Sequence, residues 1–249
     1  MIPLPKPSDA VHKAWLLRIL GAFYDSPLLA NSLYFKGGTC AAMQGLILRF
    51  SVDLDFDYVG SREEMPRVRE EMEKIFAVNK LTIANKSHVA PQYFLKYETV
   101  GTSERNTLKI DAFFPELKAN KYETVLLPEV NRVVTCQDKE TMFGNKLVAL
   151  IDRHEKHGAV AGRDVFDIHS FFMKGFSYNK EVIAEQRPSV TLPAFFQRLI
   201  SFVEAEVSQE VIDQDLNVLL PYDGFKHIRL ILKQETITFL RDELARLKS

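Results

Sequence analysis

The 249-residue sequence predicts an α/β (α+β) fold, in which a mixed sheet with helices is followed by an α-helical C-terminal domain. Strand-like runs cluster in the first half, at residues 81–84, 93–99, 107–114 and 124–127. Beyond about residue 135 the predicted segments are nearly all helical, at residues 139–153, 163–174, 192–206 and 225–247. We therefore predict two domains, residues 1–135 and residues 136–249.

The first 80 residues alternate between predicted helices and strands. Ser8 precedes apolar residues at helical spacing and is expected to cap an N-terminal helix. A short strand at residues 33–35 leads into a glycine pair and a helical turn at residues 40–46. A second strand follows at residues 54–59, and residues 61–77 form a charged helix with an apolar face.

Composition and charge exclude several classes of protein. The formal net charge is −1 and 46% of the residues are hydrophobic, so the chain can bury a substantial core but is not a globally basic nucleic-acid binder. Cys40 and Cys136 lack the spacing of a metal site or a disulfide framework, which indicates a reducing compartment. The apolar run at residues 14–23 is short and carries Arg18, and no signal-peptide pattern precedes it. We expect a cytoplasmic protein with no membrane span.

The turn after the first strand consists of Lys36, Gly37, Gly38 and Thr39. Glycines at such a turn let backbone N–H groups approach a phosphate at a helix N-terminus, where anions are favoured. We expect Thr39 to cap the helix or to contact phosphate through its hydroxyl, and Lys36 to add positive charge. The alternative is an ordinary tight turn that binds nothing.

Three aspartates alternate with apolar residues along the second strand: Asp53, Asp55 and Asp57 with Leu54, Phe56 and Tyr58. Residues two apart on a strand project to the same face, so the carboxylates lie close together on a strand that packs on a core. Like charges about 4 Å apart repel by roughly 4 kcal/mol at an effective dielectric near 20, and a divalent cation offsets that repulsion. The pattern favours a metal site, and a solvated edge strand is the alternative.

Two segments together resemble a known family. The first is Lys36-Gly37-Gly38-Thr39 followed by Arg49-Phe50-Ser51-Val52-Asp53-Leu54-Asp55-Phe56. The second is Lys146 within residues 144–150, then Arg153, then Arg163-Asp164-Val165-Phe166-Asp167-Ile168. They resemble the first motif, the lysine and the RDxxD element of the AbiEii/AbiGii-type toxins. These are nucleotidyltransferase-fold proteins of prokaryotic toxin–antitoxin and phage-defence systems, whose MenT relatives modify tRNA. The resemblance extends from residue 36 to about residue 170.

The resemblance implies a nucleotidyltransferase toxin with a helical domain that completes the active site. Asp53 and Asp55 would hold Mg²⁺ (or Mn²⁺) on the triphosphate of an NTP, an acceptor hydroxyl would attack the α-phosphate, and pyrophosphate would leave. The expected acceptor is the tRNA 3′ end, and a cognate antitoxin is the expected partner. The nucleotide-binding residues would be Lys36, Gly37, Gly38, Thr39, Ser51, Lys146 and Arg163. The alternatives are a protein or small-molecule acceptor, or a non-catalytic nucleotide-binding protein.

Asp111 interrupts the otherwise apolar strand at residues 108–114. A buried aspartate is unfavourable unless it is paired or binds a ligand. Because nucleotidyltransferase folds often take a third carboxylate from a neighbouring strand, we expect Asp111 to complete the metal site and to act as a base.

The second half offers Lys146 and Asp167 as further catalytic residues. Lys146 is a natural contact for triphosphate oxygens, and its alternative is an ordinary solvated lysine on an amphipathic helix. Asp164 lies near a helix start, where its negative charge interacts favourably with the helix dipole. Asp167 lies deeper in the helix. We expect Asp167 to pair with Arg153, Arg163 or Lys146, or to position the substrate. Residues 226–248 carry six Lys and Arg against three acids, so we expect this segment, or Lys118 and Lys121, to contact phosphates of RNA.

Overall fold

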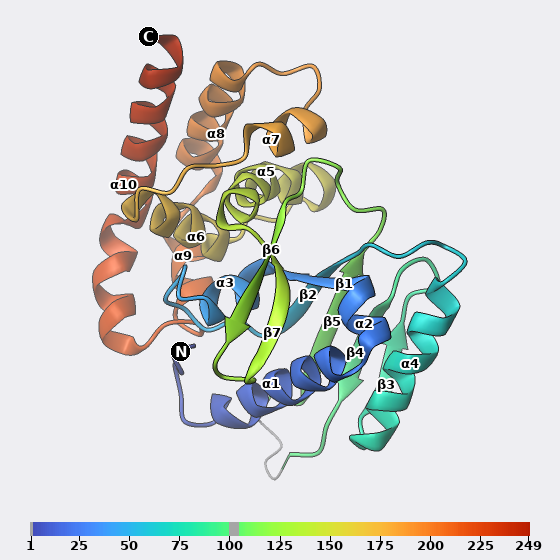
Figure 1. Cartoon of the computed structure of the whole chain (residues 1–249). Helices are drawn as coiled ribbons and strands as arrows, with labels where there is room; N and C mark the ends of the chain where they lie inside the picture. The colour runs from blue at the N-terminus through green and yellow to red at the C-terminus, as the bar shows by residue number, and fades with distance from the viewer. Residues whose placement is uncertain (1, 100–104) are drawn as a thin grey trace. The chain divides into compact units, whose positions relative to one another are not determined.

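The computed structural model describes residues 2–99 and 105–249, which fold into ten helices and a seven-stranded sheet (Figure 1). The chain divides into two compact units. Unit 1 contains the sheet and comprises Met1–Gly45, Phe50–Glu116 and Lys121–Asp138. Unit 2 is helical and comprises Leu46–Arg49, Leu117–Asn120 and Lys139–Ser249. The predicted mixed α/β fold class is confirmed.

Unit 1 is built on a mixed sheet. Its strands are β1 (Leu33–Lys36), β2 (Asp53–Tyr58), β3 (Thr82–Lys86), β4 (Gln92–Lys96), β5 (Thr107–Phe113), β6 (Tyr122–Leu127) and β7 (Arg132–Gln137). Its helices are α1 (Asp9–Asp25), α2 (Pro27–Ser32), α3 (Gly37–Met43) and α4 (Met65–Val78). The strand order is β3-β4-β5-β2-β1-β7-β6. The pairs β2–β5 and β1–β7 are parallel, and the other neighbours are antiparallel.

The strand β7 is absent from the sequence prediction, which placed the change to helix near Thr135. β6 and β7 form an antiparallel hairpin in which Leu127 pairs with Arg132. Its turn contains no glycine, and Asn131 supplies the left-handed backbone conformation, with φ of 51°. Asparagine tolerates this region better than most residues, but it marks a turn less clearly than glycine does. The hairpin was therefore missed.

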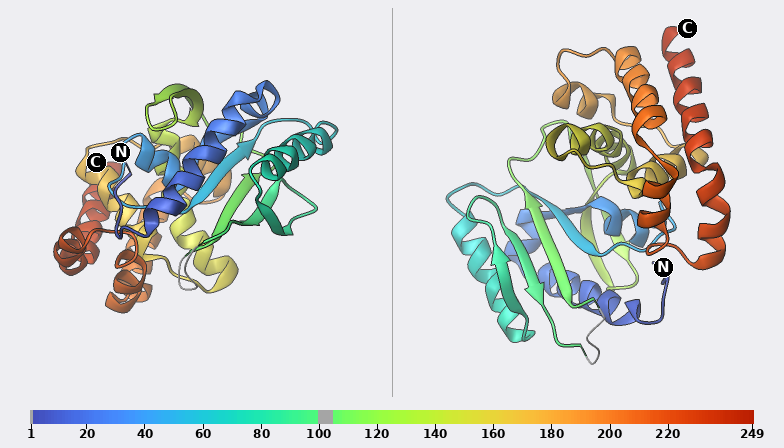
Figure 2. Two further views of the ribbon diagram at one scale, coloured as in Figure 1. Left: turned by 90° about the horizontal axis from the view of Figure 1, so that it is seen from below. Right: turned by 180° about the vertical axis from the view of Figure 1, so that it is seen from behind.

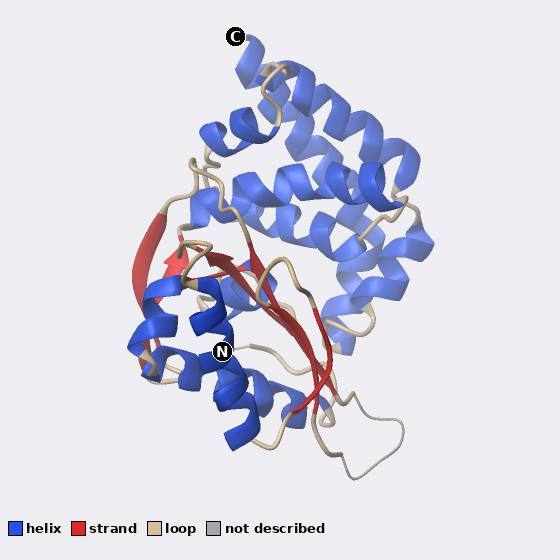
Figure 3. Ribbon diagram, turned by 90° about the vertical axis from the view of Figure 1, so that its right-hand side faces the viewer, coloured by secondary structure: helices blue, strands red, loops and turns tan. Residues whose placement is uncertain are grey.

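One face of the sheet is covered by α1, α2 and α4, which also pack on one another (Figure 3). Phe23 of α1 lies 5.8 Å from Phe56 and 6.1 Å from Phe76 of α4, measured between ring centroids. Because Phe56 belongs to the apolar face of β2, the predicted alternation of this strand is confirmed. The side chains of Asp53 and Asp55 therefore project to the opposite face of the sheet.

The predicted cap at Ser8 is wrong. Ser8 has helical backbone angles, and its side chain makes no capping hydrogen bond to α1. The side chain of Asp9 instead accepts a hydrogen bond from the backbone N–H of Lys6 at 3.1 Å, so the chain is fixed just before the helix.

Unit 2 contains α5 (Lys139–His157), α6 (Gly162–Met173), α7 (Lys180–Gln186), α8 (Leu192–Glu206), α9 (Gln209–Leu216) and α10 (Tyr222–Lys248). The four longer helices match the four predicted segments, whereas the short helices α7 and α9 were not predicted. In Figure 2, α8 and α10 run alongside each other in orange and red. Aromatic side chains fill the core, and Phe143 of α5 stacks on Phe171 of α6 at 5.0 Å. Within the described ranges, no helix is both long and apolar enough to cross a membrane.

Candidate functional site

Four charged side chains lie side by side on the sheet face opposite α1 and α4. In the parallel pair of β2 and β5, Asp53 lies opposite Lys109 and Asp55 lies opposite Asp111. Paired residues project to the same face of a sheet, so these four side chains form one group. Lys109 Nζ lies 2.7 Å from Asp111 Oδ2. We call Asp53, Asp55, Lys109 and Asp111 the carboxylate patch.

Asp55 carries its negative charge in an unfavourable electrostatic environment. Burial raises the pKa of Asp55 to about 6, and the negative charges of Asp53 and Asp111 add to this increase. The ammonium groups of Lys36 and Lys109 oppose it only in part. A positive charge that binds beside Asp55 would therefore be stabilised.

Gly37 packs directly against the carboxylate of Asp55. Its φ of 78° lies in the left-handed region, and a Cβ atom built on it would overlap Asp55 Oδ2. Any other residue at this position would therefore be strained and would also displace Asp55. The neighbouring Gly38 is buried in α3. Gly37 thus brings the backbone at the start of α3 close to the carboxylate patch.

Thr39 does not cap α3, and this part of the prediction is wrong. The helix begins at Gly37, with Lys36 at the capping position, and no side chain caps it. Thr39 is fully buried, and its hydroxyl donates a hydrogen bond to the backbone carbonyl of Asp53 at 2.5 Å. Its hydroxyl thus fixes the start of β2. Ser51 is also buried, with 8% of its surface exposed.

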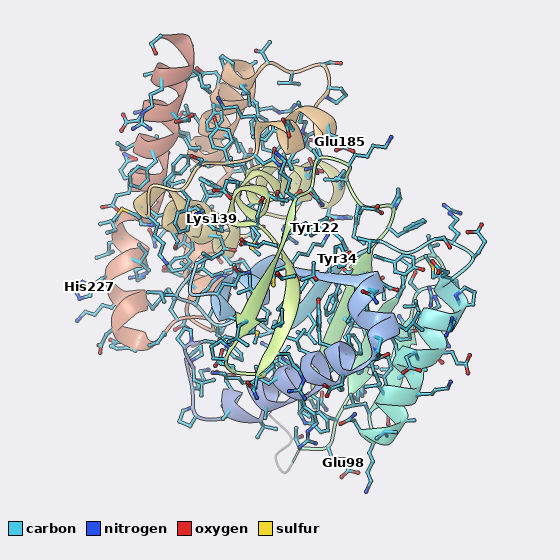
Figure 4. All side chains as sticks on the ribbon, viewed as in Figure 1. Tyr34, Glu98, Tyr122, Lys139, Glu185 and His227 are labelled. Carbon is cyan, nitrogen blue, oxygen red and sulfur yellow. The ribbon has the colours of Figure 1, made fainter. Side chains whose placement is uncertain are left out.

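Asp57 differs from the two aspartates before it on the strand. It is fully buried, and Lys36 Nζ lies 2.6 Å from its Oδ1. Its Oδ2 accepts hydrogen bonds from the hydroxyl of Tyr122 at 2.9 Å and from the amide of Gln137 at 2.6 Å. Tyr122 also packs edge-on against Tyr34 at 4.8 Å, and both are labelled in Figure 4. Asp57 therefore joins β1, β2, β6 and β7, and it binds the ammonium predicted to attract nucleotide.

The donor set of the carboxylate patch fits a divalent cation. Carboxylate oxygens are the hard ligands that Mg²⁺ and Mn²⁺ accept, and the raised pKa of Asp55 reflects negative charge that a cation would offset. The described residues contain no group of three His, Cys, Asp or Glu already arranged to hold a metal. Asp111 Oδ2 accepts hydrogen bonds from Lys109 and, at 3.0 Å, from Gln92. Asp53 and Asp55 are thus the first candidates to hold a cation, and Asp111 would join them if Lys109 releases it.

A second charged cluster lies in unit 2, centred on Asp167. Arg49 donates from Nε to Oδ1 of Asp167 at 2.6 Å and from Nη2 to Oδ2 at 2.7 Å. Lys146 Nζ lies 2.9 Å from Oδ2 of Asp167 and 3.1 Å from Oδ1 of Asp164. Asp164 also accepts from Nε of Arg153 at 3.1 Å. We call these five residues the ion cluster; it contains three cations and two carboxylates, so its net charge is positive.

The ion cluster keeps its members ionised despite their burial. Burial alone would raise the pKa of Asp164, but the cations of Lys146 and Arg153 outweigh it and lower that pKa to about 2. The pKa of Asp167 is also lowered, because Arg49 and Lys146 outweigh the effect of burial. Burial acts to lower the pKa of Lys146, but the carboxylates of Asp167 and Asp164 raise it above its usual value. Lys146 is therefore a fixed, charged ammonium.

Arg163 lies beside this cluster in sequence but has another partner. Its Nη1 is 3.6 Å from Oδ1 of Asp215, and its side chain is 40% exposed. The structure thus brings Asp53, Asp55 and Asp111 together in unit 1, and Lys146 and Asp167 together in unit 2.

Two residues of these groups were not identified from the sequence, Arg49 and Lys109. Arg49 was expected only as part of a motif, and the partners considered for Asp167 all came from nearby in the sequence. Of these partners Lys146 does contact Asp167, whereas the contact with Arg49 spans 118 positions, which no local pattern reveals. Lys109 did leave a sequence signal, because it lies two residues before Asp111 on the same strand and hence on the same face.

Comparison with known proteins connects these observations to a family. The family described as "Nucleotidyl transferase AbiEii toxin, Type IV TA system" matches residues 18–225. Two crystal structures from Helicobacter pylori have similar folds. A candidate nucleotidyltransferase aligns with a TM-score of 0.57 and 19% identity over 97% of this chain and 98% of that one. The protein JHP933 aligns with a TM-score of 0.54 and 20% identity over 99% and 98% of the respective chains. A comparison with curated proteins gives no match.

The family match covers most of the chain and includes both the carboxylate patch and the ion cluster. The two Helicobacter pylori structures show the same overall fold. The chain belongs to the AbiEii family of nucleotidyl transferase toxins of type IV toxin–antitoxin systems and is a nucleotidyltransferase.

Proposed function

We propose that the chain transfers a nucleotide from an NTP to a hydroxyl of the tRNA 3′ end, with a divalent cation, Mg²⁺ or Mn²⁺, at Asp53 and Asp55. The observation that carries this proposal is the carboxylate patch, in which Asp55 has a pKa raised to about 6 beside Asp53 and Asp111. Such a group of carboxylates is unfavourable in an empty sheet face and favourable around a cation. A bound cation would supply charge neutralisation for the triphosphate.

In the proposed reaction, the acceptor oxygen forms a bond to the α-phosphorus of the NTP. The bond between the α-phosphorus and the oxygen that bridges to the β-phosphorus breaks. Pyrophosphate leaves, and the hydroxyl proton passes to the carboxylate of Asp111. Lys146 binds triphosphate oxygens as a fixed point charge, a role for which its raised pKa and partial exposure suit it. Gly37 gives the turn before α3 room beside Asp55. The toxin family further implies a cognate antitoxin as the cellular partner.

The choice of tRNA as acceptor rests on the family resemblance more than on the basic tail. Of the six basic residues in α10, four already contact other protein groups: Arg229, Lys233, Arg241 and Arg246. Arg229, for example, pairs with Asp213. These contacts reduce the charge that the tail helix offers to phosphates, so we do not assign RNA binding to α10.

The acceptor is tested by incubating the purified chain with each α-³²P-labelled NTP and Mg²⁺. Separate reactions receive total tRNA, total cell protein or a small-molecule extract. We expect label in the tRNA fraction, at the 3′ end, and no label when Asp53→Asn replaces the wild type. Label in protein or in small molecules would replace tRNA as the acceptor while retaining the enzyme class. No label in any fraction would contradict the proposal.

A further inference from the structure

Lys109 places a positive charge within the carboxylate patch. It pairs in register with Asp53, and its ammonium lies 2.7 Å from Asp111 Oδ2. On its other side the ammonium faces the ring of Phe94, 6.0 Å from the centroid. Three carboxylates and one ammonium thus share the patch.

Lys109 differs from Lys36, the other lysine near Asp55, in how its ammonium is paired. Lys36 is held by the fully buried Asp57 at 2.6 Å, so its charge is already matched. Lys109 and Asp111 are about equally exposed, at 30% and 32% of their side chains. A lysine side chain is a flexible stem that carries a point charge, so a partly exposed pair of this kind can open without disturbing the sheet.

We propose that Lys109 is an internal counter-ion that a divalent cation displaces from Asp111, after which its ammonium contacts phosphate oxygens of the NTP. The inference rests on the proposed cation site at Asp53 and Asp55. It explains why the three carboxylates can lie together before a cation binds. It also explains why Asp111 does not yet form a metal site with them among the described residues.

Supporting evidence comes from the geometry of the pair. The ammonium of Lys109 lies 2.7 Å from Asp111 Oδ2, and Lys109 pairs in register with Asp53, so its positive charge is next to the carboxylates that would hold a cation. An uncharged side chain at this position would not compete with a cation for them.

The proposal predicts effects of opposite sign on two ligands when Lys109→Met removes the charge. Mn²⁺ binding to the nucleotide-free chain, followed by the EPR signal of unbound Mn²⁺, should become up to about fivefold tighter. Binding of inorganic triphosphate in the presence of Mn²⁺, measured by calorimetry, should become about fivefold weaker or more. Lys109→Arg keeps the charge and should change Mn²⁺ affinity little.

Lys96→Met is the matched control, because Lys96 is an exposed lysine on β4 of the same sheet and pairs with Thr107. It should leave both affinities as in the wild type. Asp55→Asn serves as the reference for loss of the cation site. Unchanged or weaker Mn²⁺ binding in Lys109→Met, together with loss in Asp55→Asn, would overturn the role of Lys109 alone. Equal Mn²⁺ binding in the wild type and Asp55→Asn would overturn the cation site and this inference with it.

Discussion

Arg49 and Asp167, which are 118 positions apart in the sequence, form a bidentate ion pair with N···O distances of 2.6 and 2.7 Å. Both side chains are almost completely buried, at 3% and 0% exposure. Lys146 shares one of the same carboxylate oxygens. The pair therefore fixes the carboxylate that in turn positions Lys146.

Removing either partner of this pair should destabilise the protein. Arg49→Ala leaves the carboxylate of Asp167 with one cation fewer, and Asp167→Ala removes the carboxylate that accepts two hydrogen bonds from the buried guanidinium of Arg49. We expect each to lower the free energy of unfolding by about 3–5 kcal/mol in chemical denaturation. Lys146→Ala should change it by less than about 1.5 kcal/mol, because Arg49 still pairs with Asp167 and Arg153 still pairs with Asp164. Similar losses for all three variants would contradict this division of roles.

Asp55 and Asp57 should respond in opposite ways to substitution although they lie two residues apart. Asp55→Asn should reduce nucleotide transfer about a hundredfold or more. It should also stabilise the fold by about 1–2 kcal/mol at pH 7, because it removes a carboxylate whose pKa is raised to about 6. Asp57→Ala should instead lower the free energy of unfolding by about 3 kcal/mol, because Lys36 loses its buried partner. Thermal melts and a transfer assay on each purified variant distinguish the two roles. A stabilised Asp57→Ala would show that the ion pair contributes nothing.

Gly37 and Gly45 form a matched pair for testing the close approach to Asp55. Both have positive φ, at 78° and 73°, but a Cβ atom on Gly45 would have no neighbour within 4 Å. Alanine at either position should therefore cost about 1–2 kcal/mol of backbone strain. Only Gly37→Ala should also displace the Asp55 carboxylate and abolish Mn²⁺ binding. Wild-type Mn²⁺ affinity in Gly37→Ala would mean that the turn does not shape the patch.

His12 makes stability depend on pH in a defined window. Burial lowers its pKa from 6.5 to about 4, and the charge of Arg105 acts in the same direction. In the fold its Nε2 lies 2.8 Å from the carbonyl of Val52, and Nδ1 lies 2.7 Å from the hydroxyl of Tyr97. The unfolded chain therefore binds the proton first as pH falls through 6.5, and the native state binds it only near pH 4.

The contribution of His12 to the free energy of unfolding is therefore complete above pH 6.5. It declines as the pH falls from 6.5 towards 4 and is constant below pH 4. The decline should amount to about 3 kcal/mol. Unfolding of the wild type and of His12→Gln, measured from pH 7 to pH 4, isolates it as the difference between the two curves. A difference that does not change with pH would show that His12 is not buried in its neutral form.

Helices and strands whose apolar residues recur at a regular spacing could be predicted from the sequence. Features that depend on contacts between distant segments could not. The alternation of β2 placed Asp53 and Asp55 on the polar face correctly, because period two follows from strand geometry. That Asp111 lies directly opposite Asp55 depends on which strands pair, which no local pattern encodes. Thr39 was expected to cap the helix or to contact phosphate, but α3 begins two residues before it, at Gly37, and buries it. The predicted pairing of Asp167 with Lys146 is confirmed, at 2.9 Å. Its second partner, Arg49, was missed because it comes from a segment before β2.

The central claim is that the carboxylate patch catalyses transfer of the α-phosphate of an NTP. The most direct test compares α-³²P-labelled with γ-³²P-labelled NTP, using the wild type and a variant with both Asp53→Asn and Asp55→Asn, each checked for folding by thermal melts. We predict that the wild type transfers only the α-label to the acceptor and releases the γ-label as pyrophosphate. The double variant should fold and transfer neither. Transfer of the γ-label, or α-label transfer by the folded double variant, would contradict the account.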